Sequence, residues 1–123
     1  MLKLAAPMLL IVMLVSACGT PGTSGAVAVE TYLTALIAKD ADAVINTSCL
    51  NWENGAQADI DAFLTVDAEL SNDFACQDIS PNQVECSGAI LFKYGEEIQE
   101  LSLEGAIYHV QEEAGEWRMC GYQ

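Results

Sequence analysis

The spacing of the apolar residues changes near residue 73, and this change limits the chain to an α+β fold. Before residue 73, apolar residues recur every three or four positions, as on one face of an amphipathic helix; the set is Val29, Tyr32, Leu33, Leu36 and Ile37. After residue 73, apolar and polar residues alternate, which is typical of strands with one buried face. The sequence therefore predicts N-terminal helices followed by an antiparallel sheet.

Three helices are predicted in the first half of the chain. The first covers residues 26–38. Asp40 can cap a second, short helix that ends near Cys49, because its carboxylate can accept a hydrogen bond from a free N–H of the first turn. Apolar spacing after Gly55 indicates a third helix that runs to about Leu70.

Four strands are predicted in the second half, at residues 73–79, 84–94, 98–112 and 116–122. Short turns rich in Pro, Asn and Gly join them, at residues 80–83, 95–97 and 114–115. Such short links predict a four-stranded antiparallel meander with the helices packed on one face. Gly105 interrupts the third strand, where a bulge would shift the register and curve the sheet.

The N-terminus carries an export signal. Lys3 precedes an apolar stretch over residues 4–15, which is shorter than the roughly 20 residues that a helix needs to span a bilayer. The tetrad Val15-Ser16-Ala17-Cys18 resembles the bacterial lipoprotein box, and this implies removal of residues 1–17 and lipidation of Cys18. Ordinary secretory cleavage after Ala17 is the alternative.

The rest of the chain then divides into a tether and one domain. Residues 18–25 are small, polar and glycine-rich, as a flexible tether is. Residues 26–123 are long enough for a single domain with a modest core. We therefore expect a membrane-anchored lipoprotein of the cell envelope whose domain lies outside the cytoplasm.

The cysteine count supports this division. Five cysteines in an exported chain leave one unpaired, and lipidation of Cys18 removes the odd one. The other four lie too far apart in sequence for zinc-type pairs, so two disulfides are favoured. Centring the first hairpin on its turn places Cys76 opposite Cys86, which leaves Cys49 to pair with Cys120.

Two segments resemble the nuclear-transport-factor-2-like fold, a cone in which a curved sheet cradles a helix, shared with SnoaL-like cyclases and ketosteroid isomerases. Residues 29–44 look like its first two helices, and residues 115–122 look like its last strand in small bacterial lipoproteins of that superfamily. The resemblance covers residues 26–123. Members include isomerases, dehydratases and binding domains, so the resemblance implies a fold more than an activity.

The charge of the chain excludes some partners. Eighteen acidic residues against four basic ones give a net charge of -14. Such a surface repels nucleic acid and anionic lipid headgroups, and it attracts cations or basic partners. We therefore expect no nucleic-acid binding, and we expect the membrane contact to run through acylated Cys18.

Candidate catalytic groups are few, and no catalytic residue is assigned. His109 is the only histidine, which excludes a histidine-based metal cluster and a Ser-His-Asp set. Its strand parity opposes that of Tyr108, so it is predicted at the surface. Asp78 and Glu104 are the candidate bases for an isomerase-like site, although most carboxylates on strands are simply solvated.

No cofactor or metal is predicted. The pairs Asp40 with Asp42 and Asp59 with Asp61 could bind calcium, yet neither follows the spaced calcium-loop pattern. Arg118 is the sole arginine; turned inward it would anchor an anion, and turned outward, which is favoured, it would offset acidic surface.

Six aromatic residues are candidates for the lining of a ligand cavity between the helices and the curved sheet; they are Tyr32, Trp52, Phe63, Tyr94, Tyr108 and Trp117. The alternative is that they fill the core of a small domain. We expect a non-catalytic domain that binds a small apolar ligand or docks an envelope protein. The alternatives are a SnoaL-like isomerase or hydratase with a carboxylate base, and a purely structural envelope protein.

Overall fold

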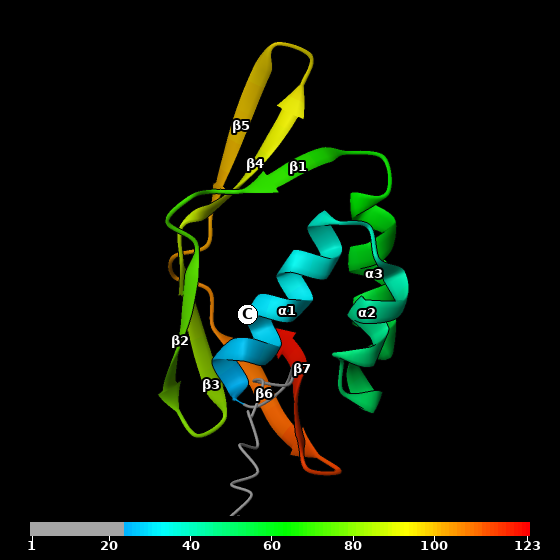
Figure 1. Ribbon diagram of the computed structural model, residues 1–123, viewed down its shortest axis with the longest axis vertical. Coiled ribbons are helices and arrows are strands. Elements are labelled where there is room, and N and C mark those ends of the chain that lie inside the picture. The colour runs from blue at the N-terminus through cyan, green and yellow to red at the C-terminus, as the bar shows by residue number, and fades with distance from the viewer. Residues whose placement is uncertain (1–23) are drawn as a thin grey trace, which may run out of the picture.

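The computed structural model describes residues 24–123, in which helices precede strands (Figure 1). The helical elements are α1 (Gly25–Ile37), α2 (Ala41–Asn46), the short 3-10 helix η1 (Leu50–Trp52) and α3 (Glu53–Phe63). The strands are β1 (Asp67–Leu70), β2 (Ala75–Ser80), β3 (Gln83–Ser87), β4 (Ala89–Tyr94), β5 (Glu97–Ser102), β6 (Tyr108–Glu113) and β7 (Glu116–Tyr122). The predicted α+β class is confirmed.

Local capping explains why the first two helices begin and end where they do. The hydroxyl of Ser24 accepts a hydrogen bond from the N–H of Val27 at 3.2 Å and so caps α1. Lys39, with φ of 58°, ends that helix in a left-handed conformation. The carboxylate of Asp40 then accepts from the N–H of Ala43 at 3.2 Å, which is the predicted cap of α2.

The prediction that the third helix runs to Leu70 is wrong. Helix α3 ends at Phe63, and Asp67–Leu70 forms strand β1 instead. Along β1 exposed and half-buried residues alternate, and the strand pairs antiparallel with β4. Four residues with this alternation satisfy a strand as well as a helix, and the hydrogen bonds available along β4 decide between the two.

The single four-stranded meander is also wrong, because the strands form two antiparallel sheets. One sheet has the order β2-β3-β6-β7, and the other has the order β1-β4-β5. The predicted second strand breaks at Gly88, where φ is 91°, so that β3 lies in the first sheet and β4 in the second. A side chain there would approach the Phe74 backbone to within 3.0 Å, which explains the glycine.

The predicted third strand breaks as well. Strand β5 ends at Ser102 and β6 begins at Tyr108. Gly105, with φ of 88°, lies in the link between them rather than in a bulge within one strand. Each of the two long predicted strands, 84–94 and 98–112, is therefore two strands that belong to different sheets. The chain forms two sheets at these breaks instead of one curved sheet.

The core lies between α1 and the four-stranded sheet. Helix α1 contacts all four strands of that sheet. The largest fully buried side chains are Tyr32 and Val29 on α1, Val44 on α2, and Val84, Val110 and Met119 on the sheet, together with Cys49. Burial of these apolar side chains is the main source of stability for the fold.

The four cysteines of the described residues lie in the two pairs that the topology predicted. Cys49 and Cys120 have Cα atoms 4.9 Å apart and join the end of the helical half to β7. Cys76 and Cys86 are directly opposite each other on β2 and β3, with Cα atoms 4.0 Å apart. Both disulfides tie the four-stranded sheet to itself or to the helices.

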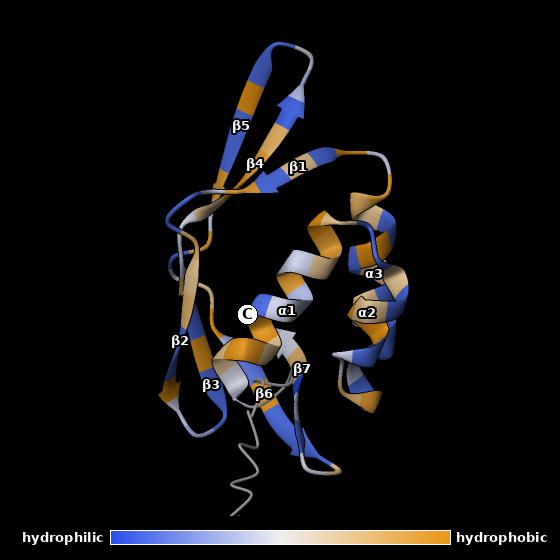
Figure 2. Ribbon diagram, viewed as in Figure 1, coloured by the Kyte–Doolittle hydropathy of each residue, from blue (hydrophilic) through white to orange (hydrophobic). Residues whose placement is uncertain are grey.

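The hairpin of β4 and β5, which we call the arm (Ala89–Ser102), projects beyond the rest of the molecule at the top of Figure 1. All six residues of β5 are exposed. Figure 2 shows apolar residues set among hydrophilic ones along this strand. The arm is thus a sheet extension that the helices leave largely uncovered.

The predicted export signal, Cys18 and nearly all of the predicted tether lie outside the described residues, which begin at Ser24. Within residues 24–123, no helix is long and apolar enough to cross a membrane.

Candidate functional site

A small pocket of about 120 Å³ lies where α1, α3 and both sheets meet. Its apolar walls are formed by Leu33, Leu36, Phe63, Ile90, Leu101 and Leu103. The other lining residues are Asp59, Tyr32, Tyr108 and Tyr122, which carry polar groups. An apolar pocket with a few converging polar groups is the usual form of a ligand site.

Asp59 on α3 organises the polar end of the pocket. One carboxylate oxygen accepts a hydrogen bond from the Tyr32 hydroxyl at 2.6 Å, and the other accepts from the Tyr122 hydroxyl at 2.8 Å. The indole N–H of Trp52 donates to the Tyr32 oxygen at 3.2 Å. These bonds link α1, η1, α3 and β7, and they hold the two tyrosine rings in place.

Burial and the Asp59 carboxylate keep the tyrosines protonated. Desolvation, followed by the hydrogen bond to Asp59, raises the pKa of Tyr32 above its ordinary value of 10.0. The same two causes raise the pKa of Tyr122 to about 12. Burial, with the negative charge of Asp59 as the smaller cause, also raises the pKa of Tyr108. At neutral pH all three hydroxyls are therefore hydrogen-bond donors.

Tyr108 supplies a donor that the protein itself does not use. It is 5% exposed and lines the pocket, and its ring centroid lies 5.9 Å from that of Tyr122. Unlike the other two hydroxyls, that of Tyr108 has no hydrogen-bond partner among residues 24–123, and it is not fully buried. A bound molecule could therefore accept a hydrogen bond at this point.

The structure brings together four of the six aromatic residues predicted to line a cavity. Tyr32, Phe63 and Tyr108 line the pocket. Trp52 bonds to the Tyr32 hydroxyl, and its ring centroid lies 5.5 Å from that of Tyr122 in an edge-to-face arrangement. Tyr94 is 48% exposed near the end of the arm. Trp117 borders a separate surface hollow beside Asp78. These two residues lie on parts of β4 and β7 that extend past the pocket.

Asp59 and Tyr122 are pocket residues that the sequence predictions missed. The sequence pattern indicates Asp59 only as half of a possible calcium pair. It nevertheless shares one helical stripe with Ala56, Ile60 and Phe63, at spacings of three and four positions. A carboxylate on the buried stripe of a helix needs donors, and this spacing is the signal that could have identified it.

The two candidate bases, Asp78 and Glu104, lie outside the apolar pocket. Asp78 is exposed and accepts a hydrogen bond from the N–H of Ala26 at 3.1 Å, so it covers the start of α1. Glu104 is exposed at the edge of a polar hollow beside the Cys76–Cys86 disulfide. Neither lines the apolar pocket, because each lies on a strand or link that faces away from it.

The remaining candidates have structural contacts. His109 is half-buried, with its Nε2 atom 3.1 Å from the side-chain amide nitrogen of Gln123. Arg118 pairs with Glu116 at 3.1 Å and with Glu113 at 3.8 Å, and it donates to the carbonyl of Asn46 at the end of α2. In the part of the chain that the structure describes, no cluster of three or more His, Cys, Asp or Glu residues could hold a metal ion.

Two solved structures share this fold. The solution structure of a SEC-C motif containing protein from Rhodopseudomonas palustris matches with a TM-score of 0.58 and 10% identity, over 85% of this chain and 80% of that one. The crystal structure of a SEC-C motif containing protein from Psychrobacter arcticus matches with a TM-score of 0.58 and 11% identity, over 83% of this chain and 61% of that one. The chain thus spans less than two thirds of the second protein. No family model and no curated protein matches the sequence.

These matches overturn the resemblance to the nuclear-transport-factor-2-like and SnoaL-like family. The proteins that share the fold are SEC-C motif containing proteins, and two sheets replace the single cone-shaped one. The segments that suggested the family, residues 29–44 and 115–122, form a pair of helices and a final strand. Such elements occur in many α+β folds and specify no family. At these identities the likeness shows the fold alone.

Proposed function

We propose that this protein is a non-catalytic binding domain, held outside the cytoplasm on a membrane by acylated Cys18, whose pocket receives a small apolar group. The observation that carries the proposal is the apolar pocket whose lining includes three protonated tyrosines and the Asp59 carboxylate that holds two of them. The hydrogen bonds of Asp59 pre-organise these side chains, so a ligand would meet a rigid site.

The size of the pocket limits the ligand. Sites for drug-sized molecules measure about 300–1,000 Å³, whereas this pocket measures about 120 Å³. A dry cavity of about 150 Å³ holds a benzene molecule. The pocket therefore suits one ring or one branched aliphatic group, and the Tyr108 hydroxyl favours a ligand with an oxygen at its edge.

The occupied carboxylate favours binding over catalysis. A general base needs an oxygen that can reach the proton of a substrate. Each oxygen of Asp59 already accepts a tyrosine hydrogen bond, at 2.6 and 2.8 Å. Asp59 is thus better suited to fixing the tyrosine rings than to moving protons.

A titration with two small aromatic probes tests the pocket. Toluene and phenol would be added to the Cys18→Ser chain, and methyl NMR shifts of Leu36 and Leu103 would be followed. We expect toluene to bind with a dissociation constant of about 1 mM, since few atoms make contact. Phenol should bind several-fold more tightly, and Tyr108→Phe should abolish that difference. Equal binding of both probes would remove the role of Tyr108.

A matched pair of variants tests where the probe binds. Leu101→Trp would fill the mouth of the pocket, because Leu101 is 53% exposed and also lines it. Ile98→Trp places the same ring on the same strand but away from the pocket, at a side chain that is 60% exposed. We expect toluene binding to be lost in the first variant and kept in the second. Loss in both or in neither contradicts the proposed site.

The membrane anchor has its own test. The lipoprotein-like tetrad Val15-Ser16-Ala17-Cys18 supports acylation, and two acyl chains at about 0.8 kcal/mol per buried methylene are enough for stable anchoring. Cys18→Ser should move the protein from the membrane fraction to the soluble fraction. Unchanged partitioning would disprove the anchor while leaving the pocket proposal intact.

A further inference from the structure

The outer edge of β5 offers a row of backbone groups to solvent. Strand β5 is the terminal strand of its sheet, and its neighbour β4 pairs with it over six residues. All six residues of β5 are exposed, and the arm that carries it projects from the molecule (Figure 1). An open strand edge of this length can pair with another extended chain.

The other strand edges are covered or short. On β2, the N–H of Cys76 donates to the Glu30 carboxylate of α1 at 2.9 Å. On β7, the N–H of Met119 donates to the carbonyl of Thr47 at 2.8 Å, and the carbonyl of Met119 accepts from Cys49 at 2.8 Å. Strand β1 has four residues. Other elements therefore bond to the outer edges of β2 and β7, whereas no backbone hydrogen bond from residues 24–123 reaches the outer edge of β5.

The hairpin geometry shows which backbone groups face outward. Tyr94 and Glu97 close a two-residue turn, and a closing pair of this kind exchanges both hydrogen bonds. Six residues further on, the N–H of Leu103 donates to the carbonyl of Gly88 at 3.0 Å. Every second residue from Glu97 to Leu103 is therefore expected to bond toward the neighbouring strand. Glu97, Gln99 and Leu101 thus bond toward β4. The backbone groups of Ile98, Glu100 and Ser102 point to the open edge.

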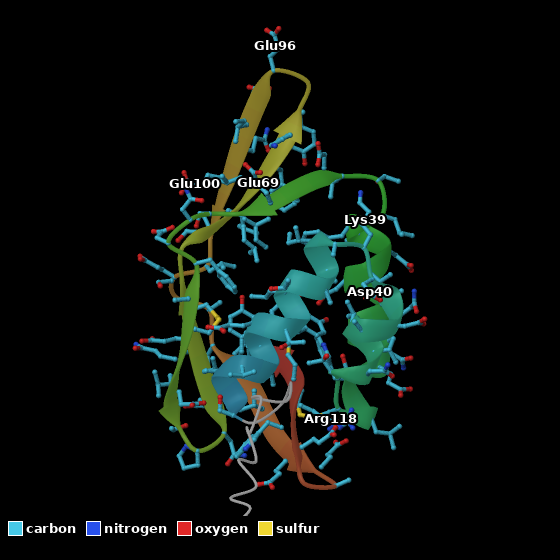
Figure 3. The ribbon with its side chains drawn as sticks, in the orientation of Figure 1. Lys39, Asp40, Glu69, Glu96, Glu100 and Arg118 are labelled. Atoms are coloured by element: carbon cyan, nitrogen blue, oxygen red, sulfur yellow. A yellow bond between two sulfur atoms is a disulfide. The ribbon has the colours of Figure 1, made fainter. Side chains whose placement is uncertain are left out.

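The side chains around this edge are acidic. Glu96, Glu97 and Glu100 lie on β5 or its turn, and Figure 3 shows Glu96 at the tip of the arm. The arm's lysine, Lys93, pairs with Glu69 of β1 at 3.3 Å and so is already partly neutralised. Two copies of β5 side by side would bring these glutamates together, which is unfavourable. The charge thus opposes self-association and favours a basic strand.

We propose that the arm docks an extended, basic segment of a partner protein as an added strand on β5. Main-chain hydrogen bonds to Ile98, Glu100 and Ser102 provide the affinity, and lysines or arginines beside Glu97 and Glu100 provide the selection. Ile98 and Leu101, which are 60% and 53% exposed, offer apolar contact to the two faces of the added strand. Leu101 also lines the mouth of the pocket, but Ile98, Glu100 and Ser102 do not. Strand addition through their backbone groups therefore does not require a pocket ligand.

The probe is an eight-residue peptide of alternating lysine and valine, with a glutamate-for-lysine peptide as its control. Both are titrated into the ¹⁵N-labelled Cys18→Ser chain. We expect the lysine peptide to slow hydrogen exchange at the amides of Ile98, Glu100 and Ser102, and the glutamate peptide to have no effect. Shifts spread over the acidic surface without protection of these amides would overturn the proposal, because they indicate unspecific charge attraction.

Two variants at one position separate strand addition from charge. Glu100→Gln removes the charge and keeps the outward N–H, so the affinity should fall about two- to threefold. Glu100→Pro removes both, and an edge strand tolerates proline where the N–H faces solvent. The affinity of this variant should fall at least tenfold relative to wild type. Equal affinity of the two variants would overturn strand addition.

A modified peptide repeats the test on the unaltered protein. Methylation of the backbone nitrogens that would face β5 leaves the charges of the peptide unchanged and removes its hydrogen-bond donors. We expect this peptide to lose at least tenfold in affinity, whether or not the proline variant folds. Binding that survives the methylation would overturn the proposal.

Discussion

The arm and the two central strands of the four-stranded sheet, β3 and β6, lie on the same two stretches of chain, yet they differ in burial and in helix cover. Strands β3 and β6 lie under α1, include the fully buried Val84 and Val110, and belong to the sheet that both disulfides join. Their continuations, β4 and β5, leave this cover and end in a fully exposed strand. Helix cover thus determines where the core ends, while strand pairing alone extends beyond it.

The largest expected effect is loss of the long disulfide. Cys49 and Cys120 are 71 positions apart, whereas Cys76 and Cys86 are 10 apart. Chain-entropy arguments give losses of about 4 and about 3 kcal/mol for replacing each pair by alanine. Urea denaturation measures both. Neither bridge reaches the arm, so local hydrogen exchange of β5 should change little. Faster exchange in β5 would show that the arm depends on the rest of the domain for its stability.

Two isoleucines compare the buried base of the arm with its exposed outer strand. Ile90 is 4% exposed at the base of β4, and Ile98 is 60% exposed on β5. Ile90→Ala should cost about 2–5 kcal/mol of unfolding free energy, because it leaves a cavity. Ile98→Ala should cost less than about 0.5 kcal/mol. Similar losses in thermal unfolding would mean that the arm belongs to the core.

The Asp59 cluster gives a pH-dependent comparison. The folded-state pKa of Tyr122, about 12, exceeds its ordinary value of 10.0. Its contribution to stability is therefore complete below pH 10 and is lost as the pH rises from 10 through about 12. Tyr32 and Tyr108 act in the same direction. The arm has no comparable carboxylate-bound tyrosine among the described residues.

Asp59→Asn tests this dependence. The variant should lose about 1–3 kcal/mol at neutral pH, because the tyrosine hydroxyls lose a charged acceptor. The pKa of Tyr122 should fall from about 12 toward 10.0. Ultraviolet titration of tyrosinate measures the change, and Tyr122→Phe assigns the transition. An unchanged titration would show that burial alone raises the pKa.

The smallest effects are expected at the two hairpin turns. Ala114, between β6 and β7, has φ of 53°, and Gly95, at the tip of the arm, has φ of 64°. A left-handed conformation costs a residue with a side chain roughly 1 kcal/mol. Ala114→Gly should therefore raise the unfolding free energy by about 1 kcal/mol. Gly95→Ala should lower the stability of the arm by a similar amount, seen as faster exchange in β5.

Local sequence signals predict much of the structure outside the arm. The amphipathic spacing of α1, the Asp40 cap and the turn at residues 114–115 depend on neighbouring residues, and each occurs where the sequence indicates it. The disulfide partners follow from the register of one hairpin and the short links between strands. Such features are readable because few distant contacts are needed to decide them.

The arm could not be predicted in the same way. Apolar residues keep one parity from Val84 through Cys86 to Ile90, across the break at Gly88. The alternation of apolar and polar residues indicates which face of a strand is buried. It does not indicate which sheet the strand joins. For the same reason the sequence did not indicate two of the pocket residues, since Asp59 and Tyr122 meet only when α3 and β7 pack together.

The position of Ser24 limits how far the domain can lie from the proposed membrane anchor. In Figure 1, α1 begins low in the molecule, at the end away from the arm. Five residues separate Cys18 from Ser24, and a link of this length reaches at most about 20 Å. A lipid at Cys18 would therefore keep the start of α1 within that distance of the bilayer. The tip of the arm, at the other end of the domain, would then be the part that can extend furthest from the membrane.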